Sequence, residues 1–177
     1  MKTFNITIMR PILLFILFAI ITCNVNAQDT VVVRNGVTTM LNAMLKNDMG
    51  TLADFTHPKI IASLGGREKA IETMNKGVAE IKSKGMSFRS ASIGKIGKFY
   101  TSGKKVYCVI PHDITISTKG GYFSSRSSVL GISQDQGKTW KFVSAGNIGR
   151  NKLKTLFPEL PDGLKILPQT DPVLHKL

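Results

Sequence analysis

The chain is predicted to fold as one α+β domain, in which N-terminal helices pack on a curved, four-stranded antiparallel sheet. Three observations predict this class. Apolar residues recur with a helical period in the first half of the chain and with a period of two in the second half. Short turns that contain glycine join the strand-like segments, which makes consecutive strands antiparallel neighbours. A sheet with one apolar face needs a cover, and the helices are available to supply it.

The first 27 residues have the organisation of a secretory signal peptide. Lys2 and Arg10 give a positive start, and Pro11–Ile21 is an unbroken apolar run. Small residues in the segment Val25–Ala27 fit a cleavage site. The apolar run is shorter than the roughly 20 residues that a transmembrane helix needs. We therefore expect export to the periplasm or the extracellular space, and cleavage after Ala27 is favoured over a lipoprotein signal that acylates Cys23.

Composition narrows the classes of partner. Cleavage would remove 27 of the 177 residues, two of the 24 basic residues and none of the 11 acidic ones, which leaves 150 residues with a net charge of +11. Cys108 would then be the one remaining cysteine, so we expect no internal disulfide and a buried, inert thiol. Dispersed positive charge attracts polyanions such as anionic envelope polymers. Nucleic acid is not expected as a partner, because the aromatic residues are not interleaved with the lysines.

The helices are predicted from the helical period of the apolar residues and from the residue types that begin or end a helix. Four are predicted before the sheet: Val31–Asp48, a short turn at Thr51–Phe55, another at Lys59–Leu64, and Arg67–Lys84. The two long ones carry an apolar stripe each. Gly50 is expected just past the end of the first, and Gly85 closes the last.

The strands follow as a meander, and a proline-rich tail ends the chain. The four predicted strands are Ser87–Tyr100, Lys105–Thr118, Tyr122–Ser133 and Thr139–Ala145. Arg150–Phe157 is predicted to be a short helix. The prolines after it cannot continue a helix or lie in a central strand, and the last residues are expected to be loose. The chain thus divides into a signal peptide (1–27), an α+β domain (28–146) and a C-terminal short helix with a proline-rich tail (147–177).

This order of elements resembles the nuclear transport factor 2-like superfamily, whose members pack helices into a strongly curved antiparallel sheet. The resemblance covers about Val31 to Gly146. It is carried by the segment Leu52–Pro58 after the first helix, the glycine pair before Arg67 and the finish Thr139–Phe142. It implies a cone-shaped fold with a cavity. The superfamily includes isomerases, cyclases, dehydratases and non-enzymatic domains, so the resemblance implies no particular reaction.

Residues 133–140 match the Asp-box pattern S-x-D-x-G-x-T-W, which is similar to turns found in sialidase-type propellers. In such a turn the Asp135 carboxylate accepts N–H groups, Gly137 takes a left-handed conformation and Trp140 packs under the hairpin. The pattern occurs once, and 150 residues cannot supply the blades of a propeller. A structural turn is therefore the favoured interpretation over a carbohydrate-related role.

Five polar residues are candidates for the lining of a ligand pocket: Asp54, His57, Tyr107, His112 and Arg126. His57 lies at a helix break, where it is either a pocket base or a histidine bonded to backbone, and Asp54 could orient it. His112 falls on the apolar face of its strand, whereas Tyr107 and Asp113 fall on the other face. An inward Arg126 would bind an anion, and an outward one would be solvated.

No catalytic set or cofactor motif is evident. The histidines lack the H-x-x-x-H spacing of a metal site, and neither a phosphate-binding G-x-x-x-x-G-K-[ST] loop nor a G-x-S-x-G elbow occurs. The favoured function is therefore an exported, non-catalytic domain with a cavity for a small apolar or anionic molecule. One alternative is an isomerase- or cyclase-like enzyme that uses His57 or His112 as its base. Another is a basic envelope-interaction protein, for which the sheet could supply a homodimer interface.

Overall fold

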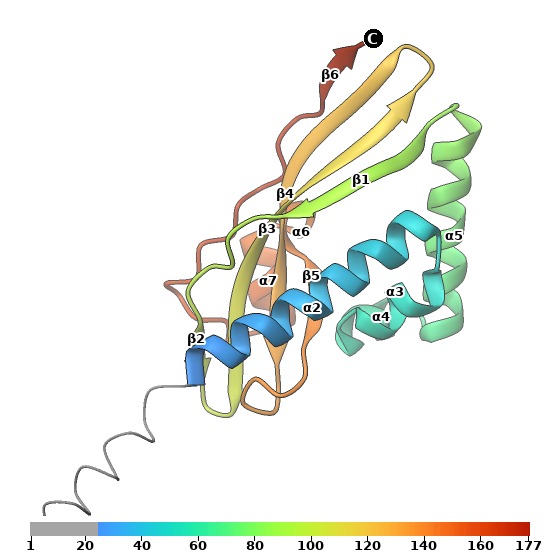
Figure 1. The fold of residues 1–177 in the computed structure, drawn as a ribbon. Coiled ribbons are helices and arrows are strands. Elements are labelled where there is room, and N and C mark those ends of the chain that lie inside the picture. Colours follow the sequence, from blue (N-terminus) through green and yellow to red (C-terminus); the bar gives the residue numbers. More distant parts are fainter. Residues whose placement is uncertain (1–24) are drawn as a thin grey trace, which may run out of the picture.

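The structure is a computed structural model that describes residues 25–177 (Figure 1). Residues 1–24, which include Cys23 and nearly all of the predicted signal peptide, lie outside the described part. The predicted cleavage site after Ala27 falls in the first turn of α2 (Val25–Lys46). Across residues 25–177, no helix combines the length and the apolar character that crossing a bilayer requires.

All the predicted helices are present, but the first begins at Val25 and not at Val31, and α6 (Ala145–Ile148) was not predicted. The helices are α2, α3 (Met49–Phe55), α4 (Pro58–Ser63), α5 (Arg67–Ser83), α6 and α7 (Arg150–Leu156). Helix α2 ends before Asn47, which has a φ of 57°, and not at Gly50. Asparagine tolerates this left-handed conformation and so can end a helix as glycine does. Asp48 then caps α3 by accepting the Thr51 N–H at 3.0 Å.

The sheet is open and antiparallel and has six strands, not the four predicted. They are β1 (Ser87–Ile93), β2 (Tyr100–Ser102), β3 (Lys105–Thr118), β4 (Gly121–Ser133), β5 (Lys141–Ser144) and β6 (Val173–Lys176). The order is β1-β3-β4-β5; β2 also pairs with β3, and β6 with β4. In β3 and β4, Val106 lies opposite Ser133 and His112 opposite Ser127.

The predicted strand Ser87–Tyr100 is divided because its middle leaves the ladder. A β-bulge between Phe88 and Ser90 shifts the register of β1 on β3. Further on, Gly97 donates its N–H to the Val109 carbonyl at 2.8 Å. A side chain at Gly97 would come within 2.9 Å of that carbonyl oxygen, so this close approach of backbones requires glycine.

The end of the proline-rich tail pairs as a strand, which corrects the expectation that it is loose. Tyr122 lies opposite His175 in the β4–β6 ladder. Their rings stack with centroids 4.5 Å apart, and the Ser124 hydroxyl lies 2.8 Å from His175 Nε2. The strand sits at the edge of the sheet, where the prolines before it cost no ladder hydrogen bond.

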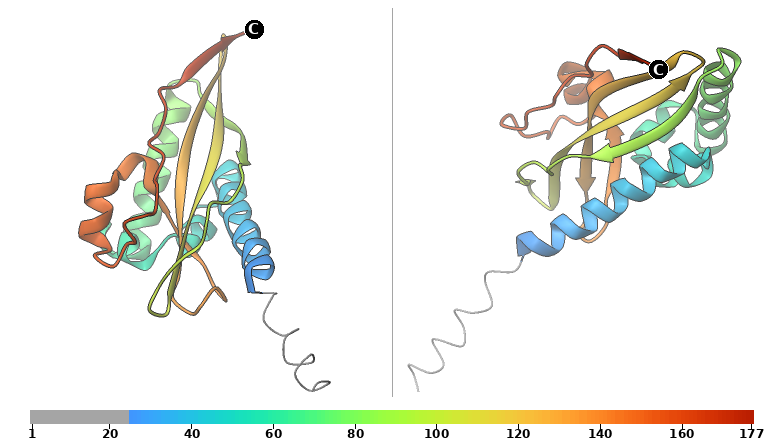
Figure 2. Two further views of the ribbon diagram at one scale, coloured as in Figure 1. Left: turned by 90° about the vertical axis from the view of Figure 1, so that its left-hand side faces the viewer. Right: turned by 45° about the horizontal axis from the view of Figure 1, so that its top comes forward.

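Helices cover both faces of the sheet, as the edge-on view in Figure 2 shows. On one face, α2 buries Val33, Val37 and Met40 against Cys108 and Ile110 of β3. On the other face, the C-terminal segment forms a second core with β3, β4 and β5. Its fully or almost fully buried residues are Leu153, Phe157, Leu160 and Leu164.

Helix α5 does not cover the sheet, although its apolar stripe predicted that it would. None of its residues belongs to either core cluster, and Ala70 is its one buried residue in the described structure. It packs instead on α3 and α4. The three helices form a group beside the sheet, joined to α2 through α3 (Figure 1).

Candidate functional site

The structure does not gather the five candidate residues at one site. His57 and Tyr107 lie near each other in the C-terminal core, and His112 lies in the core under α2. Arg126 and Asp54 are each held in an exposed ion pair. The isomerase-like alternative pairs a histidine base with Asp54 or Tyr107. Of the two openings described below, one is lined by His57 without Asp54 or Tyr107, and the other by Asp54 without a histidine.

His57 is buried and caps α4. The ring nitrogen Nδ1 accepts the backbone N–H of Lys59 at 3.2 Å, and the backbone N–H of His57 donates to the Phe142 carbonyl at 2.9 Å. The edge of its ring meets the Phe157 ring at a centroid distance of 4.8 Å. The side-chain amide nitrogen of Gln134 lies 3.4 Å from the other ring nitrogen, Nε2. Burial, together with the positive charges of Lys59 and Lys105, lowers the pKa of His57 to about 4.

The space beside His57 is too small for a ligand. A cavity of about 20 Å³ lies between His57, Gln134 and an ion pair of Lys105 with Glu159. Such a volume admits roughly one water molecule. The Tyr107 hydroxyl is buried on the same face and has no hydrogen bond of normal geometry to the described residues. Burial first, and then Glu159, raise the pKa of Tyr107 to about 12.

His112 and Arg126 lie on opposite faces of the sheet. His112 is 4% exposed, and its Nδ1 has no hydrogen-bond partner among residues 30–177. The same holds for the hydroxyl of Ser127, which lies opposite in β4. Burial lowers the pKa of His112. Arg126 points outward and forms a two-pronged ion pair with Asp113, at 2.8 and 3.1 Å. Arg126 thus takes the outward, solvated position, and the carboxylate of Asp113 already balances its charge.

The Asp-box segment is a structural turn. Asp135 accepts hydrogen bonds from the Thr139 N–H at 2.8 Å, the Thr139 hydroxyl at 2.7 Å and the Ser133 hydroxyl at 2.8 Å. Gly137 has a φ of 93°, and Gln136 before it has a φ of 60°. The Trp140 ring is buried and donates its N–H to the Gly137 carbonyl at 2.9 Å. These contacts confirm the local interpretation of the motif.

A larger opening lies between α3, α4 and the start of α5. It is a cleft of about 340 Å³, a size within the roughly 300–1,000 Å³ usual for ligand sites. Its apolar lining comes from Ala53, Pro58, Ile61 and Ala62. Its charged groups are Asp54, Arg67 and Lys141, from α3, α5 and β5.

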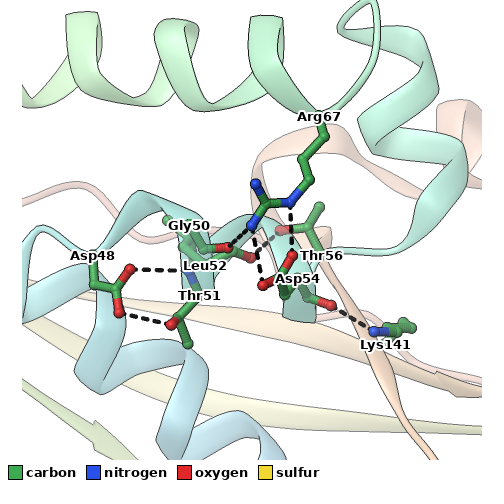
Figure 3. A network of polar contacts seen from close by, with 8 residues as sticks. All are labelled: Asp48, Gly50, Thr51, Leu52, Asp54, Thr56, Arg67 and Lys141. Carbon is green, nitrogen blue, oxygen red and sulfur yellow. Dashed lines mark hydrogen bonds and ion pairs between the residues drawn. The ribbon is translucent and has the colours of Figure 1, made fainter.

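Figure 3 shows how these charged groups are held. Arg67 donates to both oxygens of Asp54, at 2.9 and 3.1 Å, and at longer range to the Gly50 carbonyl. This pairing lowers the pKa of Asp54 and raises that of Arg67. Lys141 donates its Nζ to the backbone carbonyl of Asp54 at 2.5 Å. The cleft therefore contains two cations and one carboxylate.

The local sequence explains why Arg67 points back at α3. Gly65 and Gly66 have φ values of 90° and 99°, a conformation that other residues adopt at a cost, so the chain reverses sharply before α5. Our sequence reasoning singled out Asp54 but missed Arg67 and Lys141. The glycine pair was visible, but the ion pair spans 13 residues and depends on the reversal.

Comparisons with protein-family models, with curated proteins and with solved structures find no match. The described residues also contain no group of three or more histidine, cysteine, aspartate or glutamate side chains that could hold a metal ion. The cleft is therefore interpreted from its own geometry and chemistry.

Proposed function

We propose that the chain is an exported ligand-binding domain, and that the cleft between α3, α4 and the start of α5 holds a small amphipathic anion. What supports this function is the combination of an apolar lining with Arg67 and Lys141 in one opening. Ligand sites typically pair apolar walls with a few placed polar groups. The apolar lining suits a short hydrocarbon or ring, and the cations suit a carboxylate.

We further propose that the domain has the nuclear transport factor 2-like architecture. The order of helices before an antiparallel meander supports this assignment, as does the position of α2 across one face of the sheet. The ligand site then lies beside the sheet and not beneath the long helices, because α2 packs directly on β3. The signal-like leader supports export.

The charges favour an anion over a cation. Asp54 matches one of the two positive charges, which leaves the excess charge of Lys141. Two of the three guanidinium nitrogens of Arg67 contact Asp54, and Nη1 has no acceptor among residues 30–177. A ligand carboxylate could thus add to the ion pair without displacing it. Arginine suits this role because its planar donors match a carboxylate.

The proposal is tested with three probes that share one chain length: octanoate, octanol and octylamine. Isothermal titration calorimetry should show binding of octanoate, weaker binding of octanol and none of octylamine. The Arg67→Gln variant should bind octanoate about 10- to 100-fold more weakly, since a hydrogen bond to a charged group contributes about 1.5–3 kcal/mol. Lys141→Gln should weaken it in the same direction.

Arg126→Gln is the matched control. Arg126 also donates two hydrogen bonds to a carboxylate and is similarly exposed, but it lies away from the cleft. This variant should bind octanoate as the unchanged chain does. Equal losses in the two arginine variants, or equal binding of octylamine and octanoate, would show that the cleft does not select anions.

A further inference from the structure

The last strand leaves one edge of the sheet open. Among residues 25–177, β6 pairs with β4 and with no other strand. The bonds of an antiparallel ladder alternate along each strand, and the ladder here reaches Leu177, which donates its N–H to the Gly120 carbonyl at 3.3 Å. By this alternation, the backbone N–H and C=O groups of Leu174 and Lys176 point away from β4. Figure 1 shows this outer edge on the side of β4 that is turned away from α5.

The same edge carries exposed apolar side chains. Val173 is 57% exposed, Leu174 46% and Leu177 95%. Natural proteins usually protect a free edge with charges, prolines or bulges, because a bare edge pairs with another strand. From Val173 to Leu177, Lys176 is the one lysine, arginine or acidic residue. This edge is therefore suited to pairing with a further strand.

The other edges of the sheet are protected. On β5, Thr56 forms a bridge to Phe142, and the backbone N–H of His57 donates to the Phe142 carbonyl. The outer strand β1 is bent by its bulge, and its exposed side chains are all polar. They are Ser87, Arg89, Ser90 and Ser92. Strand β2 has only three residues. Within the described part of the chain, the unprotected edge is therefore that of β6.

Two copies of this edge are complementary under a two-fold rotation. When His175 lies at the axis of an antiparallel pair, Leu174 lies opposite the second copy's Lys176, and Val173 lies opposite its Leu177. Each pair of Leu174 and Lys176 then exchanges two backbone hydrogen bonds, and the lysine stem covers the leucine. Val173 and Leu177 lie on one face of the strand, because they are four residues apart. The two most exposed apolar side chains of the edge therefore cover each other.

The sequence disfavours the neighbouring registers. A shift by one residue would place opposed side chains on opposite faces. With Leu174 at the axis, Pro172 would lie opposite Lys176 and would have no N–H to donate. With Lys176 at the axis, two lysines would face each other, which is destabilising. The register centred on His175 avoids both faults.

We propose that the chain forms a two-fold dimer through β6, in which the two antiparallel strands join two sheets into one. A second copy is favoured over a foreign peptide because the segment is complementary to itself in one register. Two short strands form a small interface, below the roughly 1,200 Å² of stable complexes, so the dimer is weak and depends on concentration. The inference goes beyond the ligand cleft, which lies at α3, α4 and α5, and does not depend on it.

The test measures self-association of the chain by sedimentation equilibrium. The average mass should rise from that of a monomer towards that of a dimer as the concentration increases. K176P removes one outward N–H from each copy and should weaken the dimer about tenfold, because two hydrogen bonds are lost. Proline at an outward position of an edge strand leaves the ladder to β4 intact. K176Q removes the charge but keeps the N–H, so it is the matched control and should dimerise as the unchanged chain does.

A second set of variants tests the register and leaves every backbone N–H in place. V173E and L177K should each weaken the dimer, because an apolar pair loses one partner. An equimolar mixture of the two should associate more tightly than either alone, since the new carboxylate of one copy lies opposite the new ammonium of the other. The double variant V173E/L177K should recover most of the association for the same reason. Circular dichroism should show all these variants to be folded, because the replaced residues are exposed.

Three outcomes would overturn the inference. A chain that stays monomeric up to about 1 mM, where even a contact worth about 4 kcal/mol is half formed, would mean that β6 does not pair with itself. Equal dimerisation of K176P and K176Q would place the dimer contact on another surface. A mixture of V173E and L177K that associates no better than either alone would contradict the pairing of residue 173 with residue 177. Binding of an extended peptide by a monomeric chain would assign the edge to a foreign strand.

Discussion

At the scale of single residues, the carboxylate of Asp135 holds the turn between β4 and β5. It accepts three hydrogen bonds, two from Thr139 and one from Ser133. The bonds from Thr139, chiefly, lower the pKa of Asp135 to about 2. A lowered folded-state pKa means that the stabilising effect is complete above the unfolded value of about 3.9. That effect is lost as the pH falls from about 4 towards 2.

Asp135→Ala should lower the free energy of unfolding by about 1–2 kcal/mol at pH 7, because the turn loses its acceptor. It should also flatten the fall in stability between about pH 4 and pH 2. Urea unfolding at several pH values measures both effects. Asp171→Ala, at an exposed tail position, is the control and should change neither. An unchanged pH dependence in Asp135→Ala would refute the assigned role.

At the scale of elements, His57 joins α4 to the sheet and to the C-terminal core. It caps the helix through Nδ1 and contacts the Phe157 ring. Its lowered pKa, about 4 against about 6.5 when unfolded, means that the unfolded chain binds more protons between these values. Stability therefore falls as the pH drops from about 6.5 to 4. Burial of His112 adds to the fall in the same direction.

His57→Asn should keep the helix cap, because asparagine is a good N-cap residue, and remove one titrating group. Each pKa unit corresponds to about 1.4 kcal/mol, so the unchanged chain should lose on the order of 3 kcal/mol over this range through His57. The variant should lose correspondingly less. Thermal unfolding between pH 7 and pH 4 measures the difference. An equally steep loss in the variant would place the titration elsewhere, with His112 the next group to replace.

The elements that the sequence predicts well are those whose signals are local. The period of α2, the turns at Gly103 and Gly137 and the contacts of the Asp box all depend on residues close in the chain. The errors concern long-range contacts. The split of the first strand depends on how closely Gly97 approaches β3, and β6 depends on the edge of β4 being available.

The candidate site shows the same limit. His57 was predicted as a pocket residue or a cap, and its burial depends on Phe157, about a hundred positions later. Arg67 was not predicted as a site residue, because the sequence next to it gives no sign that its side chain lines a cleft. The reversal at Gly65 and Gly66 turns it towards Asp54. Lys141 enters the cleft from another element, β5.

At the scale of the whole molecule, the sheet separates two cores of different origin. The N-terminal helix fills one, and the segment after residue 146 fills the other. Figure 2 shows this segment on the face opposite α2. Ser128 also donates its hydroxyl to the Leu167 carbonyl at 2.6 Å, and Thr170 donates its backbone N–H to the Arg126 carbonyl at 2.8 Å. The C-terminal segment is thus a structural layer, although its prolines suggest a loose tail.

Two truncations separate the contribution of this layer from that of the last strand. A chain that ends at Pro172 loses β6, whose residues Val173 and Leu174 are exposed, and should still unfold cooperatively with a stability lower by about 1–2 kcal/mol. A chain that ends at Gly146 also loses Leu153 and Phe157, which are almost fully buried.

Burying each such side chain contributes about 1.5–3 kcal/mol, and a whole domain is stable by only about 5–15 kcal/mol. The layer holds four of them, so the chain ending at Gly146 should show no cooperative thermal transition by circular dichroism and should bind hydrophobic dyes. The chain ending at Pro172 should unfold cooperatively and should not bind hydrophobic dyes. A sharp, unshifted transition in the chain ending at Gly146 would mean that residues 25–146 fold alone and that the second core is an appendage.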